Sequence, residues 1–222
     1  MVPAFQIGSE DWWRLRRLRL SGVSESLSSS QVKVIRTDDP LEREALLAFI
    51  KKRYEELEIV PPSWSPPRFS GPFFVAYLPS IKGPASCAAL VERDPPCKKV
   101  YPGEWRKIKG FFRKPAEITF LATAKDLKAK NTLFHLFKAI YHYALSHRIT
   151  DLLVCINPKH ADFYEKILLF ERRGSRKEHP FLPGLFVILE HLDLKKARER
   201  YFQVYGSFPP EYNLYQFFVS GE

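Results

Sequence analysis

The stretch ITDLLVCINPKHADFYEKILLFE, residues 149–171, decides the fold because it joins a buried strand directly to a helix. The apolar run Leu152–Ile156 predicts the strand, and Asn157-Pro158 marks its end. Asn is a good helix N-cap and Pro suits the first helical position, so a helix carrying Tyr164 is predicted to start here. Helix N-termini direct free N–H groups outward and attract anions. The sequence therefore predicts an anion-binding spot with Tyr164 beside it.

Length and composition favour one α/β domain with appended segments, since 222 residues that are 45% hydrophobic suffice for a large core. No apolar run approaches the roughly 20 residues of a membrane-spanning helix, and charges interrupt the N-terminal stretch where a secretory signal would be apolar. Cys87, Cys97 and Cys155 are too few and scattered for a disulfide framework or a zinc site. We expect a cytoplasmic protein without a metal, and Cys155 is more typical of a core residue than of a nucleophile.

The net charge of +10 indicates an anionic partner, and the excess is concentrated between Arg93 and Lys114. Eight basic residues stand there against Asp94 and Glu104. A solvated loop explains this segment as well as a binding surface does. Because no nucleic-acid-binding motif is present, we expect no specific nucleic-acid contact, and a basic nucleic-acid binder is the weakest interpretation.

Residues 1–30 are expected to be a flexible or appended extension. WWRLRRLRL, residues 12–20, is predicted to form a short basic amphipathic helix, and SGVSESLSSS, residues 21–30, a flexible linker. The extension is either a partly ordered tail or a contact for a membrane surface or a carrier protein.

Residues 31–193 are expected to form the main domain, and residues 194–222 a helix and an aromatic tail packed on it. Alternation and helical periodicity predict the elements. These are strands Gln31–Arg36, Phe73–Leu78, Ala85–Val91, Ala116–Ala124, Leu152–Ile156 and Leu185–His191, and helices from Pro40 to about Leu57, from Asn131 to about His147, after Asn157, and over Leu194–Tyr205. Their order predicts a mixed α/β sheet with helices on both faces.

The element order, together with NPKHADFYEK at residues 157–166, resembles the GNAT acyltransferases. Those enzymes read N-x-x-A-x-x-[FY]-Y-[ED]-[KR]-L-G-F at the same strand-to-helix junction. The resemblance covers about residues 31–193. It implies a GNAT-like, mostly antiparallel mixed sheet, and it implies that Tyr164 protonates the departing thiolate.

The junction ATAKDLKAKNTLFHLF, residues 122–137, contains none of the glycines with which GNAT enzymes close on the pyrophosphate of CoA. A second resemblance fits better. Ala116–Thr123, Asn157–His160 and the two residues Leu168-Leu169 before Phe170 are similar to the long-chain N-acyl amino acid synthases, relatives of the acyl-homoserine-lactone synthases. Two positions depart from that pattern: Leu169 stands where Gly is usual, and Phe120 where a basic residue is often found.

The resemblance implies two catalytic residues, Glu117 as the base for the attacking amine and Tyr164 as the acid. Each has a simpler interpretation, because Glu117 can point to solvent and Tyr164 can pack with an ordinary hydroxyl hydrogen bond. The base role requires partial burial to raise the carboxyl pKa. Main-chain N–H groups around Phe120–Ala122 are expected to stabilise the oxyanion.

The same resemblance implies a set of residues that contact the donor thioester. They are Leu121, Ala122, Lys125, Lys128, Lys130, Asn131, Asn157 and His160. A lone histidine such as His160 is more often a capping or packing residue. A dry tunnel for the acyl chain is expected among aromatic side chains, although each one taken singly is more typical of plain core; they are Phe111, Phe112, Phe134, Phe137 and Tyr141.

The first hypothesis is an N-acyltransferase that moves a long acyl group from acyl carrier protein or a CoA thioester to the amine of an amino acid or a similar small molecule. No permanently bound cofactor is expected. The partners are the acidic carrier or CoA, the amine, and as a further alternative a peripheral membrane surface. The competing hypotheses are an acetyl-CoA-dependent acetyltransferase and a non-catalytic GNAT-like binding protein.

Overall fold

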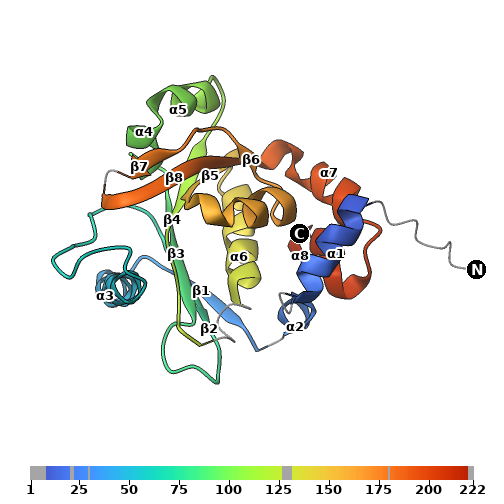
Figure 1. The fold of residues 1–222 in the computed structure, drawn as a ribbon, viewed down its shortest axis with the longest axis horizontal. Helices are drawn as coiled ribbons and strands as arrows, with labels where there is room; N and C mark the ends of the chain where they lie inside the picture. Colours follow the sequence, from blue (N-terminus) through green and yellow to red (C-terminus); the bar gives the residue numbers. More distant parts are fainter. Residues whose placement is uncertain (1–8, 21–22, 30, 127–131, 180, 220–222) are drawn as a thin grey trace, which may run out of the picture.

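The strands of this computed structural model form one mixed sheet in the order β1-β2-β3-β4-β5-β8-β6, with β7 paired to β8 (Figure 1). The structure describes residues 9–20, 23–29, 31–126, 132–179 and 181–219. Of the described strand pairs, β4–β5 is parallel and the others are antiparallel. The bounds are β1 Lys33–Thr37, β2 Phe73–Tyr77, β3 Ser86–Val91, β4 Pro115–Thr123, β5 Asp151–Ile156, β6 Glu171–Arg172, β7 Lys177–His179 and β8 Leu182–Asp193. The predicted mixed, mostly antiparallel sheet is confirmed.

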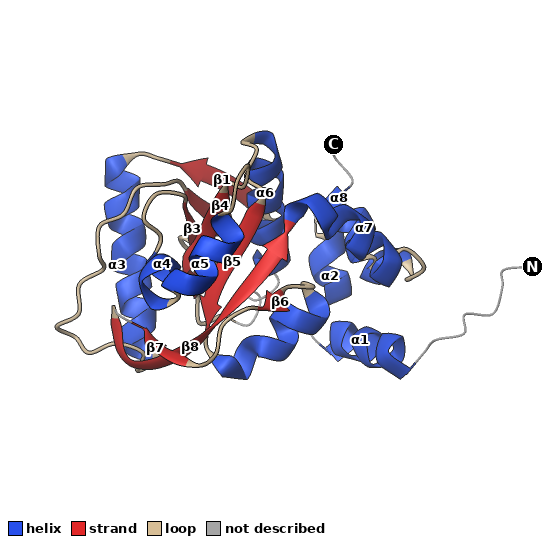
Figure 2. Ribbon diagram, turned by 90° about the horizontal axis from the view of Figure 1, so that it is seen from above, coloured by secondary structure: helices blue, strands red, loops and turns tan. Residues whose placement is uncertain are grey.

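Helices cover both faces of the sheet (Figure 2). One face carries α3 (Pro40–Glu56), α4 (Pro96–Val100) and α5 (Pro102–Lys109). The other carries α6 (Thr132–Ser146), with α1 (Ser9–Leu20), α2 (Val23–Ser28), α7 (Leu194–Tyr205) and α8 (Leu214–Val219) around it. The central strands are mostly apolar because both of their faces are buried: Phe73 and Val75 of β2 pack under α3, while Phe74 and Ala76 pack against the α6 side.

The predicted helix start at Asp39-Pro40 is confirmed. The Asp39 carboxylate accepts hydrogen bonds from the backbone N–H groups of Leu41 and Glu42, at 2.8 and 3.0 Å. These bonds satisfy two of the N–H groups that a helix leaves free at its first turn. Helix α7 has the predicted bounds, and the Asp193 side chain caps it in the same way.

Two segments differ from the sequence-based prediction. Residues 23–28, expected within a flexible linker, form α2, because Val23 and Leu27 lie one helical turn apart and both pack on the core below α6. The basic segment from Arg93 to Lys114 contains α4 and α5, which bury Cys97 and Trp105 against the sheet. Residues 21–30 were predicted as a linker, and for the basic segment a solvated loop was one of two open interpretations, because the few apolar residues of both segments are spread among many polar ones.

The helical segment after Asn157 begins and ends irregularly. It starts as a 3₁₀ turn, η2 (Pro158–His160), and ends as a π-helix, η3 (Phe163–Ile167). Three residues separate Lys166 from Phe170, one more than in the GNAT pattern, and the wider π turn accommodates the additional residue. Leu169 then adopts a left-handed conformation, with φ of 58°, where the resembling families have Gly. Its side chain is 2% exposed, so the position combines backbone strain with a buried leucine.

We predict that Leu169→Gly lowers the free energy of unfolding by about 1–3 kcal/mol. Truncating a buried leucine costs about 2–5 kcal/mol, which exceeds the roughly 1–2 kcal/mol of relieved left-handed strain. The matched control is Glu58→Gly, because Glu58 has φ of 56° after the end of α3 and an exposed side chain. That change is expected to stabilise the protein by up to about 1 kcal/mol. Urea denaturation measures both, and a stabilising Leu169→Gly would contradict the explanation.

Candidate active site

The site forms where β4 and β5 separate. The two strands pair from Pro115–Asp151 to Ile118–Val154 and then diverge. On its other edge β4 contains a β-bulge, since Ala89 pairs with Thr119 while Cys87 pairs with Ala122. The bulged residue Phe120 has φ of 54°. The extra residue reverses the alternation of the strand, so Phe120 and Ala122 face α3.

A cavity of about 540 Å³ extends from this divergence toward α3 and the β7–β8 turn. Most of its lining is apolar, with Ile118–Lys125 of β4 and the residues after it along one wall. The remaining lining residues include Tyr54, Trp64, Cys155, Phe163, Tyr164, Phe181, Leu182 and Leu185. This volume and this lining are typical of a small-molecule site.

Tyr164 lies on η3 and lines the cavity, although only 4% of its surface is exposed. Its ring is held edge-on by Phe137, Phe163 and Phe170, with ring centroids 5.5 to 6.0 Å away. Burial raises the pKa of the Tyr164 hydroxyl well above its ordinary value of 10.0. The described residues supply this hydroxyl with no hydrogen-bond partner. A protonated phenol is therefore available to a ligand in the cavity.

Glu117 is buried in β4 and does not reach solvent, since it is 1% exposed. Burial raises its pKa from 4.5 to about 7, and the backbone N–H of Cys97, which donates to Oε2 at 2.7 Å, limits the rise. The Cys155 thiol also contacts the carboxylate, and Cys155 itself lines the cavity. Glu117 is not in the lining, so the solvent-facing interpretation is wrong and the carboxylate lies behind Cys155.

The residues expected to contact the donor fall into two groups. Leu121, Ala122, Lys125, Asn157 and His160 all line the cavity. Lys128, Lys130 and Asn131 lie outside the described residues.

The side chain of Asn157 forms a helix cap, whereas that of His160 is exposed. The Asn157 side chain accepts the backbone N–H of Lys159 at 3.1 Å, as predicted for an N-cap. His160 is exposed, and partial desolvation together with Lys159 lowers its pKa.

The predicted aromatic tunnel is wrong in its membership. Phe111 and Phe112 are 94% and 95% exposed. Phe134, Phe137 and Tyr141 are buried in the core on the α6 side and do not line the cavity. Their helical periodicity in the sequence indicates burial without showing what each side chain is buried against.

Several lining residues come from segments that gave no functional signal in the sequence. From α3, the Tyr54 hydroxyl donates to the Leu121 carbonyl at 3.3 Å and Arg53 Nε donates to the Thr123 carbonyl at 2.7 Å. His179 of β7 also lines the cavity, and desolvation lowers its pKa to about 4, so it is neutral at physiological pH.

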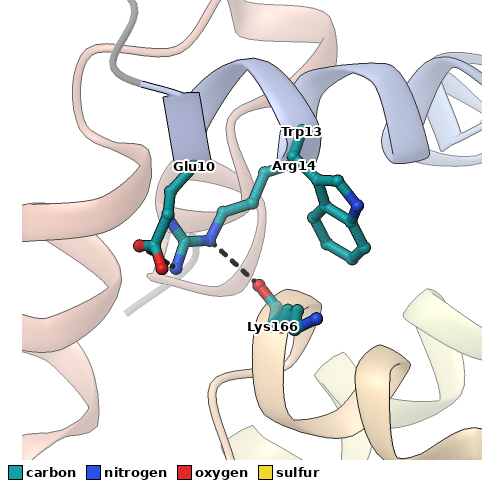
Figure 3. Close-up of a pocket in the computed structure, with 4 residues that line it drawn as sticks. All are labelled: Glu10, Trp13, Arg14 and Lys166. Carbon is teal, nitrogen blue, oxygen red and sulfur yellow. Dashed lines mark hydrogen bonds and ion pairs between the residues drawn. The ribbon is translucent and has the colours of Figure 1, made fainter.

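The helix that carries Tyr164 is held at its C-terminal end by both ends of the chain. Tyr205 of α7 donates to the Ile167 carbonyl at 2.6 Å and Tyr201 to the Leu168 carbonyl at 2.7 Å. Arg14 of α1 donates from Nε to the Lys166 carbonyl at 3.2 Å, beside a small pocket of about 250 Å³ (Figure 3). These bonds satisfy carbonyls that a helix end leaves free.

Among the described residues, no cluster of three His, Cys, Asp or Glu side chains is arranged to hold a metal ion. Within the same residues, no helix has the length and apolar character needed to cross a lipid bilayer.

Comparison with known proteins connects this geometry to an activity. Residues 86–193 match the family model described as the N-acyl amino acid synthase FeeM. The structure of FeeM, an N-acyl amino acid synthase from uncultured soil microbes, is similar with a TM-score of 0.64 and 22% identity over 76% of this chain and 93% of that chain. The chain is a GNAT-like N-acyltransferase similar to the N-acyl amino acid synthases.

Other solved structures share the GNAT fold. A putative N-acetyltransferase from Lactobacillus plantarum has a TM-score of 0.54 at 16% identity, covering 74% of this chain and 99% of that chain. A mutant of the spermidine N-acetyltransferase SpeG from Vibrio cholerae has a TM-score of 0.51 at 15% identity, covering 78% and 99%. A comparison with curated proteins gives no match. The fold and enzyme class of this N-acyltransferase are thus as the sequence predicted.

Removing the hydroxyls that cap η3 is expected to impair catalysis more than folding. We predict that Tyr201→Phe with Tyr205→Phe costs about 1–3 kcal/mol of stability, since each buried carbonyl loses its donor. Below the melting temperature kcat is expected to fall at least ~5-fold with KM little changed, because Tyr164 is displaced. Tyr212→Phe, on a half-buried tyrosine away from η3, is the control. An unchanged kcat would show that the capping bonds are only structural.

Glu117 is expected to make stability depend on pH. The folded protein retains a proton on Glu117 that the unfolded chain loses, because the pKa is about 7 when folded and 4.5 ordinarily. The free energy of unfolding should therefore fall as pH rises from about 4.5 to 7, by up to about 3 kcal/mol. Glu117→Gln should remove the contribution of Glu117 to the slope of stability against pH, while the contributions of other titratable groups remain. Urea denaturation at several pH values tests it, and parallel curves for both proteins would refute the assigned shift.

Proposed function

We propose that this N-acyltransferase moves a long acyl chain from a thioester of acyl carrier protein or CoA to the amine of an amino acid or a similar small molecule. The observation that carries the proposal is the apolar cavity at the divergence of β4 and β5, with the Tyr164 hydroxyl at its wall. The match of residues 86–193 to the N-acyl amino acid synthase family supports the same acceptor class.

The cavity suits an acyl chain longer than acetyl. Its volume of about 540 Å³ and its lining by side chains such as Trp64, Phe181 and Leu185 offer far more apolar surface than two carbons require. Each buried methylene contributes roughly 0.8 kcal/mol, so chain length alone can dominate the binding of the donor.

The oxyanion formed on attack would be stabilised by β4. The carbonyls of Leu121 and Thr123 accept bonds from α3, so these residues face the gap that β5 leaves. In a strand the N–H of a residue points to the same side as its C=O. We therefore assign the N–H groups of Leu121 and Thr123 as donors to the thioester oxygen, in a water-poor site where such bonds are strong.

Tyr164 would protonate the thiolate that leaves. Its raised pKa keeps the phenol protonated at neutral pH, and Tyr164 lines the cavity. Glu117 would receive the proton of the amine, because a pKa of about 7 suits a general base at neutral pH. Since Cys155 lies between Glu117 and the cavity, we propose that the proton passes along the Cys155 thiol or a water beside it.

The carrier-borne donor is favoured over free CoA by sequence. No glycine is available in residues 122–137 to bring backbone donors around a pyrophosphate, and the described cation there, Lys125, is exposed. An acidic carrier would meet the basic residues of the protein, mainly increasing the rate of encounter. We also propose a peripheral membrane surface as a second partner, and a cytoplasmic location from the three free cysteines.

The test is an activity assay with the purified protein, acyl donors from two to sixteen carbons on carrier protein and on CoA, and a panel of amino acids and polyamines. We expect long-chain N-acyl amino acids by mass spectrometry, with carrier-borne donors giving the higher kcat/KM. Transfer restricted to acetyl-CoA would instead identify a short-chain acetyltransferase, and no transfer from any donor would refute the proposal.

We predict that Tyr164→Phe lowers kcat about 10²–10³-fold with little change in stability, because it removes a general acid and no internal hydrogen bond. Tyr143→Phe on α6, which contacts Phe74 and His147 away from the cavity, is the matched control and should retain activity. Equal activity of both variants would show that Tyr164 only packs.

A further inference from the structure

Two adjacent phenylalanines project from the protein at the loop between α5 and β4. Phe111 is 94% and Phe112 95% exposed, the highest values among the exposed large apolar side chains of the described residues. Phe112 has φ of 63°, a left-handed conformation that a bulky residue seldom adopts. An exposed apolar pair held in an unfavourable backbone conformation indicates a contact outside the folded chain.

Basic residues flank the pair in the sequence, and three of them, Lys98, Arg113 and Lys114, form ion pairs with acidic side chains. Residues 98–114 contain seven cations against one acidic residue, Glu104. Lys107 and Lys109 are exposed and take part in no ion pair within the described chain. The loop tip, residues 106–112, therefore combines two exposed phenyl rings with exposed lysine side chains.

The base of the tip is fixed. Arg113, directly after the pair, forms a double hydrogen bond with the buried Asp151 and a second ion pair with Asp193 at 3.0 Å. On the other side, the buried Trp105 anchors α5 to the sheet. The contacts of Arg113 and Trp105 thus anchor both ends of the tip, between which Phe111 and Phe112 are exposed.

We propose that residues 106–112 insert into the surface of an anionic phospholipid bilayer, with the two phenyl rings among the acyl chains and Lys107 and Lys109 at the headgroups. Aromatic side chains bordered by Lys and Arg are typical of interfacial membrane contacts, and cytoplasmic leaflets are anionic. The proposal locates the peripheral membrane contact of the proposed function but is tested by binding alone, so it can fail while acyl transfer stands.

This surface is better suited to lipid than to the acyl carrier. The tip precedes β4, whereas the cavity follows β4 from Ile118 to Lys125 at the other end of the strand. A carrier docked at the tip would present its acyl arm to the wrong end. A bilayer needs no complementary groove, so the protruding side chains of Phe111 and Phe112 are sufficient for insertion.

The N-terminal helix α1, which the sequence offered as the membrane contact, is less suitable. Leu15 and Leu18 are buried in the core, so the apolar side of the helix is already occupied. The exposed Trp12 is covered in part by Arg16, 5.4 Å from its ring.

The experiment is co-sedimentation of the full chain with vesicles of phosphatidylcholine, with and without phosphatidylserine. We expect binding that requires phosphatidylserine and weakens with salt. Phe111→Ser with Phe112→Ser should reduce partitioning at least ~10-fold. Lys107→Gln with Lys109→Gln should reduce it about fivefold for each cation removed.

The controls are Phe202→Ser, an exposed phenylalanine on α7, and Lys195→Gln with Lys196→Gln, two exposed lysines at the start of that helix. Both should bind like the unaltered protein, and thermal melting confirms that each variant is folded. Phosphatidylserine-dependent binding that survives loss of both phenylalanines would overturn the proposal. The proposal would also be overturned if the protein bound no vesicles but needed the two phenylalanines to retain acyl carrier protein or single-stranded RNA. The tip would then be a macromolecular docking surface.

Discussion

The separation of β4 from β5 after Ile118 and Val154 is the constraint on which the rest of the structure depends. Parallel strands that remained paired would satisfy each other's backbone groups and leave no space between them. Here the ladder ends in mid-strand, and the bulge at Phe120 turns β4 away on its other side. The freed backbone is partly satisfied by Arg53 and Tyr54 of α3. The same event thus opens the cavity and places main-chain groups along its wall.

Keeping such a gap open requires support from outside it. The helix with Tyr164 crosses the open end of the sheet, and its irregular π turn leaves carbonyls that regular winding would pair. Tyr201, Tyr205 and Arg14 donate to them from segments at the two ends of the chain. We propose that α1 and α7 therefore support the site. Their contribution explains how a strained backbone at Leu169 is tolerated, since burial of its side chain and the capped carbonyls offset the strain.

Sequence reasoning succeeded where the signal is local. Asn157-Pro158 and Asp39-Pro40 fix helix starts through bonds made within a few residues, and both were found as predicted. It failed where the outcome depends on distant partners. The periodicity of Phe134 and Phe137 correctly indicated burial, but the bulge in β4 and the packing of η3 decide that these rings lie in the core and not in the cavity. Helix α2 was missed for the same reason, because Val23 is buried only through its packing against α6 and the rest of the core.

Glu117 stays a proposed base, and the structure adds the groups that surround its carboxylate. Its position on the central strand was sufficient to nominate it, and burial supplies the raised pKa that a base needs at neutral pH. What the sequence did not reveal is that Cys97 and Cys155 enclose the carboxylate, since they come from α4 and β5 and meet only in the fold. A carboxyl behind a thiol can accept a proton only through an intermediate group. In the proposed mechanism that group is Cys155, which was interpreted from the sequence as a core residue and which lines the cavity beside the Glu117 carboxylate.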